Sequence, residues 1–353
     1  METILFLTHA EAGGSLAKPA LETLSAATAL SRQLPDASLV VGLVAGAGAQ
    51  AAAGSIASCG AVRFLAVAGQ DFAAARYATD AAAAEALVRA AGATLVLAPG
   101  ASRWARCLAG VAQRLNGRAD THVTALTVED GAPTATRWYY RQRIEATLQR
   151  SHRPWFLLIE PGAGEPWQGG PGHAALEDLP VAVDERLRRT TFAGLRVPPA
   201  GQQTIRPEAD VLLVAGAGWT KKQADGQTHA PEAERLILGF LENAQASLGG
   251  SKSLVDLSGE GQAVLSCMTH LNQVGQTGST PRHPKGLATC CHGEEPHVVG
   301  WRFINARRAV NLDPNCGWAR GKADVLYVAD AFAVMEEVNA LLAEKKQAAM
   351  VEP

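Results

Sequence analysis

A chain of 353 residues is long enough to form two domains, each with its own hydrophobic core. Its formal net charge is −2, so it lacks the excess of lysine and arginine that a nucleic-acid-binding surface needs, and we expect no nucleic-acid partner. No apolar run reaches the length of a membrane span and the N-terminus enters a strand-like run directly, so we expect a soluble, cytoplasmic protein without membrane insertion.

Short apolar runs alternate with alanine-rich stretches through the first half of the chain. We predict buried parallel strands at Ile4–Leu7, Leu39–Val44, Val62–Val67, Thr94–Leu97 and Phe156–Ile159. Helical periodicity predicts helices between them, over residues 18–33, 70–92 and 103–116. This alternation of strands and helices is typical of a doubly wound α/β domain.

Arg137–Arg150 is a basic segment that also carries Trp138, Tyr139 and Tyr140. Two interpretations of this segment remain open. It is either a solvated edge of a sheet or a contact with another subunit, because aromatic residues and arginines anchor interfaces.

Two irregular stretches follow and mark the domain organisation. Gly162–Gly172 is rich in glycine and proline and predicts a loop. Val197–Arg206 precedes a fresh apolar run, and we place the domain boundary there. We therefore expect an N-terminal α/β domain over residues 1–200, with a role in subunit contact, and a C-terminal α/β domain over residues 207–353.

The second half continues the α/β pattern. We predict a strand at Val211–Val214, a helix at Pro231–Leu248, strands at Ser253–Leu257, Ala309–Asn311 and Val325–Val328, and a closing amphipathic helix at Phe332–Lys345. Gly216-Ala217-Gly218 directly follows the first of these strands. A single GxG is weak evidence for a dinucleotide-binding turn, because the full GxGxxG fingerprint is missing.

The six cysteines are irregularly spaced and form no disulfide framework, so we expect free thiols. Cys290-Cys291-His292, with His297 nearby, could ligate a metal. Adjacent cysteines rarely reach one tetrahedral ion without strain, however, and no second Cys-x-x-Cys pair completes a site. The four-thiolate spacing of an iron–sulfur cluster is also missing. We therefore expect no metal.

The segment Gln273–Gly278 (QVGQTG) combines two glycines with three uncharged polar side chains. Glycines let a backbone approach a ligand closely, and glutamine and threonine side chains can hydrogen-bond the edge of a heteroaromatic ring. Taken alone, the segment has an alternative interpretation as an ordinary glycine-rich turn.

This segment resembles the signature loop of the electron-transfer flavoprotein alpha subunit, and the similarity continues downstream at nearly the family's spacing. The matching positions are Pro281, Leu287-Ala288, His292-Gly293, His297, Gly300, Ala309–Pro314, Ala323-Asp324 and Ala329-Asp330. The resemblance covers residues 207–345, whereas the N-terminal half resembles the family only in its pattern.

The resemblance implies two doubly wound parallel-sheet domains of the α/β class, the C-terminal one a Rossmann-like FAD-binding domain. The cofactor-binding residues that it implies are Gln273, Val274, Gly275, Gln276, Thr277, Gly278, His292, Gly293, His297, Asn311 and Asp330. Thr277 would donate to the flavin near N5, and His297 would lie beside the pyrimidine O2. Asn311 would hold the adenosine or the pyrophosphate, and Asp330 the ribose–adenine end. No catalytic residue is implied, because an electron carrier needs no acid–base group.

The same resemblance implies partners. A beta-type subunit, which in this family also holds AMP, would complete a heterodimer. A flavin dehydrogenase would supply electrons, and a quinone-linked or iron–sulfur oxidoreductase would accept them. A non-redox structural or regulatory paralogue with a degenerate flavin pocket is the alternative. A third interpretation, a nicotinamide dehydrogenase, is supported only by Gly216-Ala217-Gly218.

Two departures from the family's pattern bear on this expectation. Glu260 stands where the family usually carries an arginine close to the flavin N5, so the potential of a bound flavin is expected to be lower. Glu294 and Glu295 follow His292-Gly293, where two carboxylates oppose a pyrophosphate unless they point away or pair with a cation. A retuned flavin site and a divergent branch with its own partner both remain open.

Overall fold

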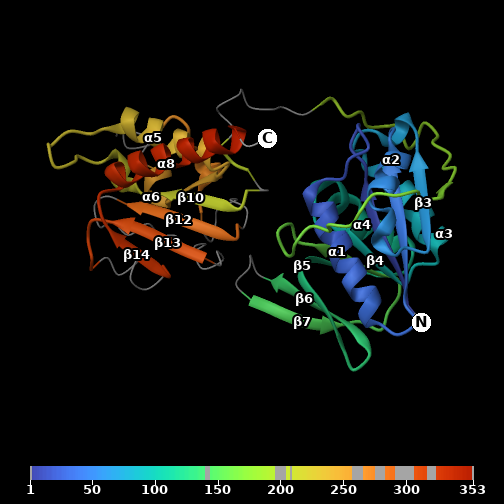
Figure 1. Ribbon diagram of the computed structural model, residues 1–353. Helices are drawn as coiled ribbons and strands as arrows, with labels where there is room; N and C mark the ends of the chain where they lie inside the picture. Colours follow the sequence, from blue (N-terminus) through green and yellow to red (C-terminus); the bar gives the residue numbers. More distant parts are fainter. Residues whose placement is uncertain are drawn as a thin grey trace. The chain divides into compact units, whose positions relative to one another are not determined.

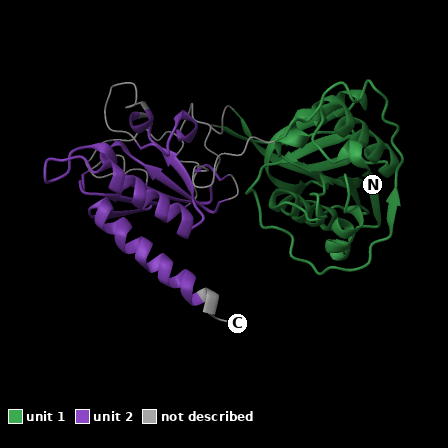
Figure 2. Cartoon of the chain, turned by 90° about the horizontal axis from the view of Figure 1, so that it is seen from above, with its two compact units in different colours: residues 1–194 green, residues 195–353 purple. Residues whose placement is uncertain are grey.

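The computed structural model describes residues 2–139, 144–194, 204–206, 209–256, 265–274, 283–290, 306–315 and 323–351. The chain divides into two compact units, residues 1–194 (unit 1) and residues 195–353 (unit 2), which Figure 2 shows in separate colours. Each unit contains a mostly or wholly parallel sheet with helices packed on it. This confirms the predicted α/β class with two doubly wound domains.

In unit 1 the described strands form one sheet in the order β7-β6-β5-β8-β4-β1-β2-β3-β9 (Figure 1). The strands are β1 Thr3–His9, β2 Ser38–Ala45, β3 Arg63–Ala68, β4 Leu95–Pro99, β5 Arg118–Glu129, β6 Ala132–Tyr139, β7 Ile144–Gln149, β8 Trp155–Ile159 and β9 Leu176–Asp178. The helices are α1 Lys18–Gln33, α2 Ala49–Ser55, α3 Tyr77–Ala91 and α4 Ser102–Arg114. All five strands predicted for the first half are therefore present.

Both faces of the parallel part of this sheet are apolar. Ile4 and Phe6 of β1 pack on the side of α1 and α2, whereas Leu5 and Leu7 pack on the side of α3 and α4. All four side chains are fully buried. Successive side chains of a strand point to opposite faces, so a strand that is covered on both sides becomes a continuous apolar run.

The helix predicted over residues 70–92 is shorter in the structure. Gln70–Phe72 forms a turn of 3₁₀-helix, and α3 begins only at Tyr77. Asp80 sets this start, because its Oδ2 accepts the N–H of Arg76 at 3.1 Å and satisfies a donor at the helix end.

The sequence pattern did not predict the antiparallel extension of the sheet by β5, β6 and β7. Exposed positions recur along β5 and β7, so no apolar run marks these strands. β7 is the outermost of the described strands of this sheet, so part of the segment Arg137–Arg150 lies at a sheet edge, which both interpretations of this segment allow. Buried Asp120 anchors the extension by accepting hydrogen bonds from Arg137, Arg150 and Trp155.

A bulge in β5 carries an ion pair between His122 and Glu160. His122 has a left-handed backbone (φ 56°), and its Nδ1 lies 2.8 Å from Oε2 of Glu160. The hydrogen bond with Glu160 raises the pKa of His122 above its ordinary value of 6.5. The contribution of this ion pair to the free energy of unfolding is therefore fully present below pH 6.5 and is lost as the pH rises through the raised pKa of His122.

We expect Glu160→Gln to remove this pH dependence. The free energy of unfolding of the variant should fall below that of the wild type under mildly acidic conditions and converge with it at alkaline pH. The difference should be small, because His122 is largely exposed. Urea unfolding across the neutral range checks this. A difference that grows as the pH rises would contradict it.

In unit 2 the described strands form a wholly parallel sheet in the order β11-β10-β12-β13-β14 (Figure 1). The strands are β10 Val211–Ala215, β11 Ser247–Gly250, β12 Lys285–Cys290, β13 Ala306–Asn311 and β14 Val325–Val328. The helices are α5 Ala230–Asn243, α6 Lys252–Asp256 and α8 Ala331–Val351. Counted within unit 2, this is the 2-1-3-4-5 order, one of the two common doubly wound arrangements.

The predicted helix Pro231–Leu248 is too long. Gln245 adopts a left-handed backbone (φ 49°), and the N–H of Ala246 bonds to the carbonyl of Leu241 at 3.1 Å. This pattern closes the C-terminus of a helix. The apolar residues that follow it belong to the buried strand β11 instead.

The strand predicted at Ser253–Leu257 is wrong. The described part of this stretch lies in α6. Ser251 supports the start of α6, because its Oγ accepts the N–H of Leu254 at 3.2 Å. The five-residue run Ser253–Leu257 is too short for its pattern of apolar side chains to distinguish a helix from a strand.

Apolar side chains cover both faces of the unit 2 sheet. Leu213 and Leu248 pack with α5 and α8, whereas Leu212 and Val214 pack on the opposite side with Ala309. Figure 1 shows α5 and α8 side by side on one face of this sheet. The amide of Asn339 on α8 donates to the carbonyl of Leu236 on α5 at 2.9 Å, which ties the two helices together.

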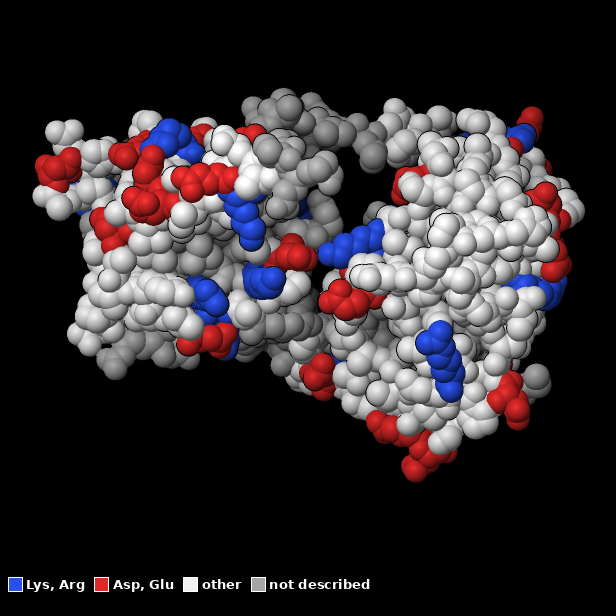
Figure 3. All heavy atoms as spheres, in the orientation of Figure 1, with Lys and Arg blue, Asp and Glu red and all other residues white. Residues whose placement is uncertain are grey.

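The outer surface of these helices is charged and mixed in sign. Figure 3 shows acidic and basic side chains intermixed over α5 and α8. One such pair joins Arg235 to Glu336 at 2.6 Å. Within the described ranges, none of the helices combines the length and the apolar character that a membrane crossing requires.

Candidate functional site

The carboxyl ends of the unit 2 strands form one edge of the sheet, which we call the carboxyl edge. β10 and β12 are parallel neighbours, and the order of the strands reverses between them. Open α/β sheets bind ligands outside the carboxyl ends of their strands at such a reversal point. The fold therefore indicates this edge as the expected ligand-binding position.

The beginning of the QVGQTG segment lies at the carboxyl edge. Gln273 forms a parallel bridge with Gly250, the last residue of β11, and the N–H of Val274 donates to the Gly250 carbonyl at 3.0 Å. Val274 is buried and packs against Leu212 and Ala288. A Cβ at position 249 would collide with the Val274 side chain. Because residue 249 is a glycine, this loop can approach β11 closely.

The glycine-rich turn after β10 also lies at this edge, but it does not begin a long helix. The N–H of Gly216 donates to the carbonyl of Thr289 on β12 at 2.9 Å. Ala217–Thr220 then forms a single 3₁₀ turn, and α5 starts only at Ala230. A dinucleotide-binding GxG turn opens directly into a helix whose N-terminus meets the pyrophosphate. The nicotinamide alternative therefore has no local geometry to support it.

Trp219 holds the turn to its surroundings. It is fully buried, and its Nε1 donates to Oγ1 of Thr289 at 2.7 Å. Its ring lies against the ring of Phe332, with centroids 4.6 Å apart. One side chain thus joins the segment after β10, the end of β12 and the start of α8. The role of Trp219 could not be predicted from the sequence, because neither partner is near it in the chain.

Asn311 is the last residue of β13 and is completely buried. Its Oδ1 accepts the N–H of Asp313 at 2.9 Å, whereas its Nδ2 has no hydrogen-bond partner among the residues that the structure describes. A buried donor without a partner costs about 1–3 kcal/mol. An acceptor atom of a ligand at the carboxyl edge would remove that cost.

Asp330 follows β14 and caps α8. Its Oδ1 accepts the N–H of Phe332 at 2.7 Å and that of Ala333 at 3.2 Å. This is the usual arrangement of an N-cap aspartate. Asp330 is therefore the N-cap of α8, and a contact with ribose has to coexist with this role.

The remaining site residues predicted from the sequence lie outside the described residues. They are Gly275, Gln276, Thr277, Gly278, His292, Gly293 and His297. Of the others, Gln273 and Val274 stand at the end of β11, Asn311 at the end of β13 and Asp330 beyond the end of β14. With about 4.8 Å between neighbouring strands, β11 and β13 are roughly 14 Å apart. A ligand that touches both must be elongated.

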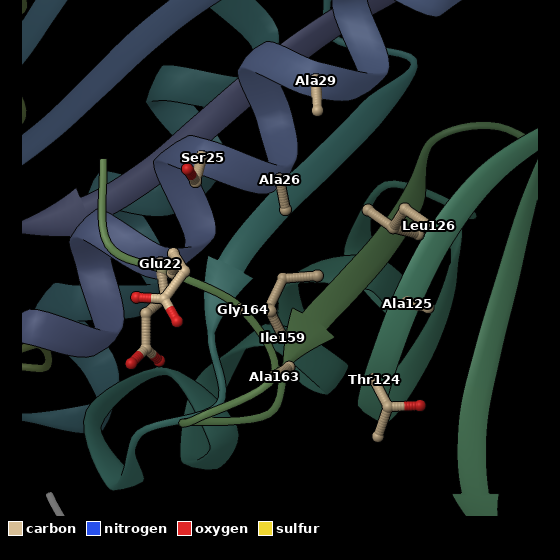
Figure 4. A pocket seen from close by; sticks show the side chains of 11 residues that line it. Glu22, Ser25, Ala26, Ala29, Thr124, Ala125, Leu126, Ile159, Ala163 and Gly164 are labelled. Carbon is tan, nitrogen blue, oxygen red and sulfur yellow. The ribbon is translucent and has the colours of Figure 1, made fainter. Parts of the chain in front are cut away.

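A separate pocket of about 310 Å³ lies in unit 1 (Figure 4). Ala26 and Ala29 of α1 form one side of it and Leu126 of β5 the other. Glu22 also lines this pocket, and its Oε2 accepts the N–H of Gly162 at 2.7 Å. None of the predicted site residues that the structure describes lines it.

The described residues contain no group of three histidine, cysteine or acidic side chains that could hold a metal ion. Cys59, Cys107 and Cys267 are free thiols, and burial raises the pKa of Cys107 and of Cys267 to about 12. These two thiols are therefore protonated at neutral pH and poor ligands or nucleophiles.

Comparison with known proteins adds an independent observation. The family model of the electron transfer flavoprotein domain matches residues 4–184, which is slightly more than half of the chain and lies within unit 1. No match was found among curated proteins. The family match and the residues that carry the QVGQTG resemblance lie in different units. The chain belongs to the electron transfer flavoprotein family.

Proposed function

We propose that this chain is the alpha-type subunit of an electron transfer flavoprotein and that unit 2 binds FAD along the carboxyl edge of its sheet. Family membership supports electron transport with a flavin. The observation that carries the proposal further is the Nδ2 of buried Asn311, which has no partner within the described part of the chain and shares an edge with Gln273 at the start of the QVGQTG segment. The distance between these two strands suits a dinucleotide better than a small ligand.

The residues present fit the parts of such a cofactor. Asn311 supplies a donor for an oxygen of the adenosine or the pyrophosphate, and Asp330 stands at the far strand for the ribose–adenine end. Thr277 and His297 are proposed to face the flavin ring, near N5 and the pyrimidine O2. When bound, FAD supplies the redox chemistry by accepting and releasing electrons. The protein binds and orients it and adjusts its potential.

The proposed partners follow from this role. A beta-type subunit would complete a heterodimer, possibly with bound AMP, a flavin dehydrogenase would donate electrons and a quinone-linked or iron–sulfur oxidoreductase would accept them. The edge strand β7 in unit 1 supports a subunit contact, because an open strand edge can pair with another chain. Arg137 and Tyr139 on the neighbouring strand β6 stack at 4.2 Å, which places an aromatic side chain next to this edge.

Asn311→Asp is expected to weaken FAD binding by about 10- to 100-fold. The substitution keeps the size of the side chain and the acceptor for Asp313, but it replaces the free donor with an oxygen that repels ligand oxygens. Titration of the purified full chain with FAD, followed by flavin fluorescence, measures the change.

Asn315→Asp is the matched control, since it adds the same charge at an exposed position in the same loop. Equal losses in both variants would show an effect of net charge and would remove Asn311 from the site. If the wild type binds no FAD, the non-redox alternative replaces the proposed function.

A further inference from the structure

Asn272 stands directly before the QVGQTG segment and uses its whole side-chain amide. It is buried, with 2% of its surface exposed. Its Oδ1 accepts the N–H of Thr269 at 3.0 Å. Its Nδ2 donates to the carbonyl of Leu248 and to Oγ1 of Thr204, each at 3.0 Å. Only an amide offers one acceptor and two donors in this shape.

These contacts fix the root of the proposed cofactor loop. The 3₁₀ turn His270–Asn272 begins with a capping box between Thr269 and Asn272. The chain then reaches Gln273 and Val274, which bond to the end of β11. The Asn272–Leu248 hydrogen bond joins the same turn to the middle of β11. The start of the loop is therefore held to the sheet at two successive points.

Thr204 brings a third segment into this arrangement. It lies where the chain enters unit 2, and its carbonyl accepts the N–H of Leu248 at 2.6 Å. Nearby, the N–H of Arg206 donates to Oγ of Ser247 at 2.9 Å. β11 is the first strand in the order of its sheet, so residues 204–206 pair with an edge that would otherwise be open. The loop root and the entry segment thus meet at one amide.

We propose that Asn272 is a positioning residue for the cofactor loop and that its hydrogen bond to Thr204 couples that loop to the segment entering unit 2. This rests on the proposed function, because the coupling concerns FAD binding. Holding the loop in place favours the docking of Thr204, and a docked Thr204 favours the placed loop. Such coupling is reciprocal by thermodynamic necessity.

Substitutions at position 204 separate the hydrogen bond from the packing. Thr204→Val keeps the shape of the side chain and removes the oxygen, whereas Thr204→Ser keeps the hydroxyl. Thr204→Val loses the acceptor for Asn272 and also the longer hydrogen bond that the hydroxyl donates to the carbonyl of Cys267 at 3.3 Å. We expect FAD to bind about fivefold more weakly to Thr204→Val and nearly normally to Thr204→Ser, which keeps both hydrogen bonds. Asn272→Asp should lose roughly 30-fold, because it puts an oxygen opposite the carbonyl of Leu248.

Hydrogen exchange at the Leu248 amide distinguishes positioning from a merely structural role. This amide is bonded to the Thr204 carbonyl and reports whether the entry segment is docked. In the wild type and in Thr204→Ser, FAD should increase its protection. In Thr204→Val, this FAD-dependent increase should be lost. A purely structural role would lower the protection equally with and without FAD.

The outcomes separate the two proposals. If the wild type binds FAD while Thr204→Val matches its affinity and keeps the full FAD-dependent protection at Leu248, the coupling is overturned and the proposed function stands. If the wild type takes up no FAD, the proposed function fails and the coupling fails with it.

Discussion

Trp219→Ala is expected to lower the free energy of unfolding of unit 2 by about 3–5 kcal/mol, the cost of removing a large aromatic side chain from a packed core. Trp219 is fully buried and lies against Phe332, and its Nε1–H bonds to Thr289. The substitution therefore leaves a cavity where the ends of β10 and β12 meet the start of α8. These are also the segments next to the proposed cofactor residues.

Trp219→Phe divides this effect into its parts. It keeps an aromatic ring beside Phe332 and removes the donor to Thr289, so we expect a smaller loss of about 1–2 kcal/mol. Leu341→Ala on α8 is the control, since Leu341 is 62% exposed and its loss should change stability by less than about 0.5 kcal/mol.

Hydrogen exchange of unit 2 amides in increasing denaturant measures these changes without interference from unit 1. A cost of Trp219→Ala below about 1 kcal/mol would show that the ring does not hold these segments together.

Arg103→Met is expected to destabilise unit 1 by about 3–5 kcal/mol, because it removes the closer of two cations from a buried carboxylate. Asp80 has no exposed side-chain surface, and the guanidinium of Arg103 bonds to its Oδ1 at 2.7 and 3.0 Å, whereas Arg106 lies 3.9 Å from its Oδ2. Asp80→Asn in the same chain should restore part of the loss, since an amide is less costly to bury than a charge that has lost its main partner.

This prediction has a pH signature. Burial raises the pKa of Asp80, and the hydrogen bonds with Arg103 act against that rise. Without Arg103 the pKa of Asp80 in the folded protein rises further. At a pH between the unfolded and the folded pKa of Asp80, the folded Arg103→Met variant therefore holds a proton that the unfolded chain has released. The deficit of the variant should therefore shrink as the pH falls through this raised pKa.

Urea unfolding of unit 1 at several pH values tests the signature, with the exposed pair of Arg63 and Glu177 as the control. Glu177→Gln should leave the stability almost unchanged. A deficit in Arg103→Met that stays constant with pH would mean that Asp80 is not the group responsible.

The sequence predicted best what depends on local pattern. The five strands of the first half were found because a strand covered on both faces is apolar throughout. The strands predicted at Ala309–Asn311 and Val325–Val328 are also present, so Asn311 is the last residue of β13 and Asp330 follows β14. Their roles toward FAD stay predictions, because position at an edge does not identify a ligand.

What the sequence missed depends on contacts between distant residues. The antiparallel strands β5 to β7 are half-exposed and held by Asp120, whose arginine partners are not adjacent to it in the chain. The end of α5 was misplaced because Gln245 adopts a left-handed backbone that glycine usually takes. Asn272 stands beside the QVGQTG segment but was not predicted, because its role depends on hydrogen bonds with Thr204 and Leu248, which are distant in the chain.

The family assignment and the cofactor proposal rest on different parts of the chain. The family match covers residues 4–184, whereas the resemblance that implies FAD lies in unit 2. A chain that kept the fold of unit 1 and lost the flavin would satisfy the first and not the second. For this reason the amount of flavin bound to the protein is the quantity to measure.

The flavin content of the purified full chain tests the central claim. The protein would be isolated alone and with a co-expressed beta-type subunit, incubated with FAD, separated from free flavin by gel filtration and denatured to release what it holds. We predict about one FAD per chain, with less retained by Asn311→Asp than by Asn315→Asp. Colourless wild-type protein that releases no FAD in either preparation would contradict the proposed function.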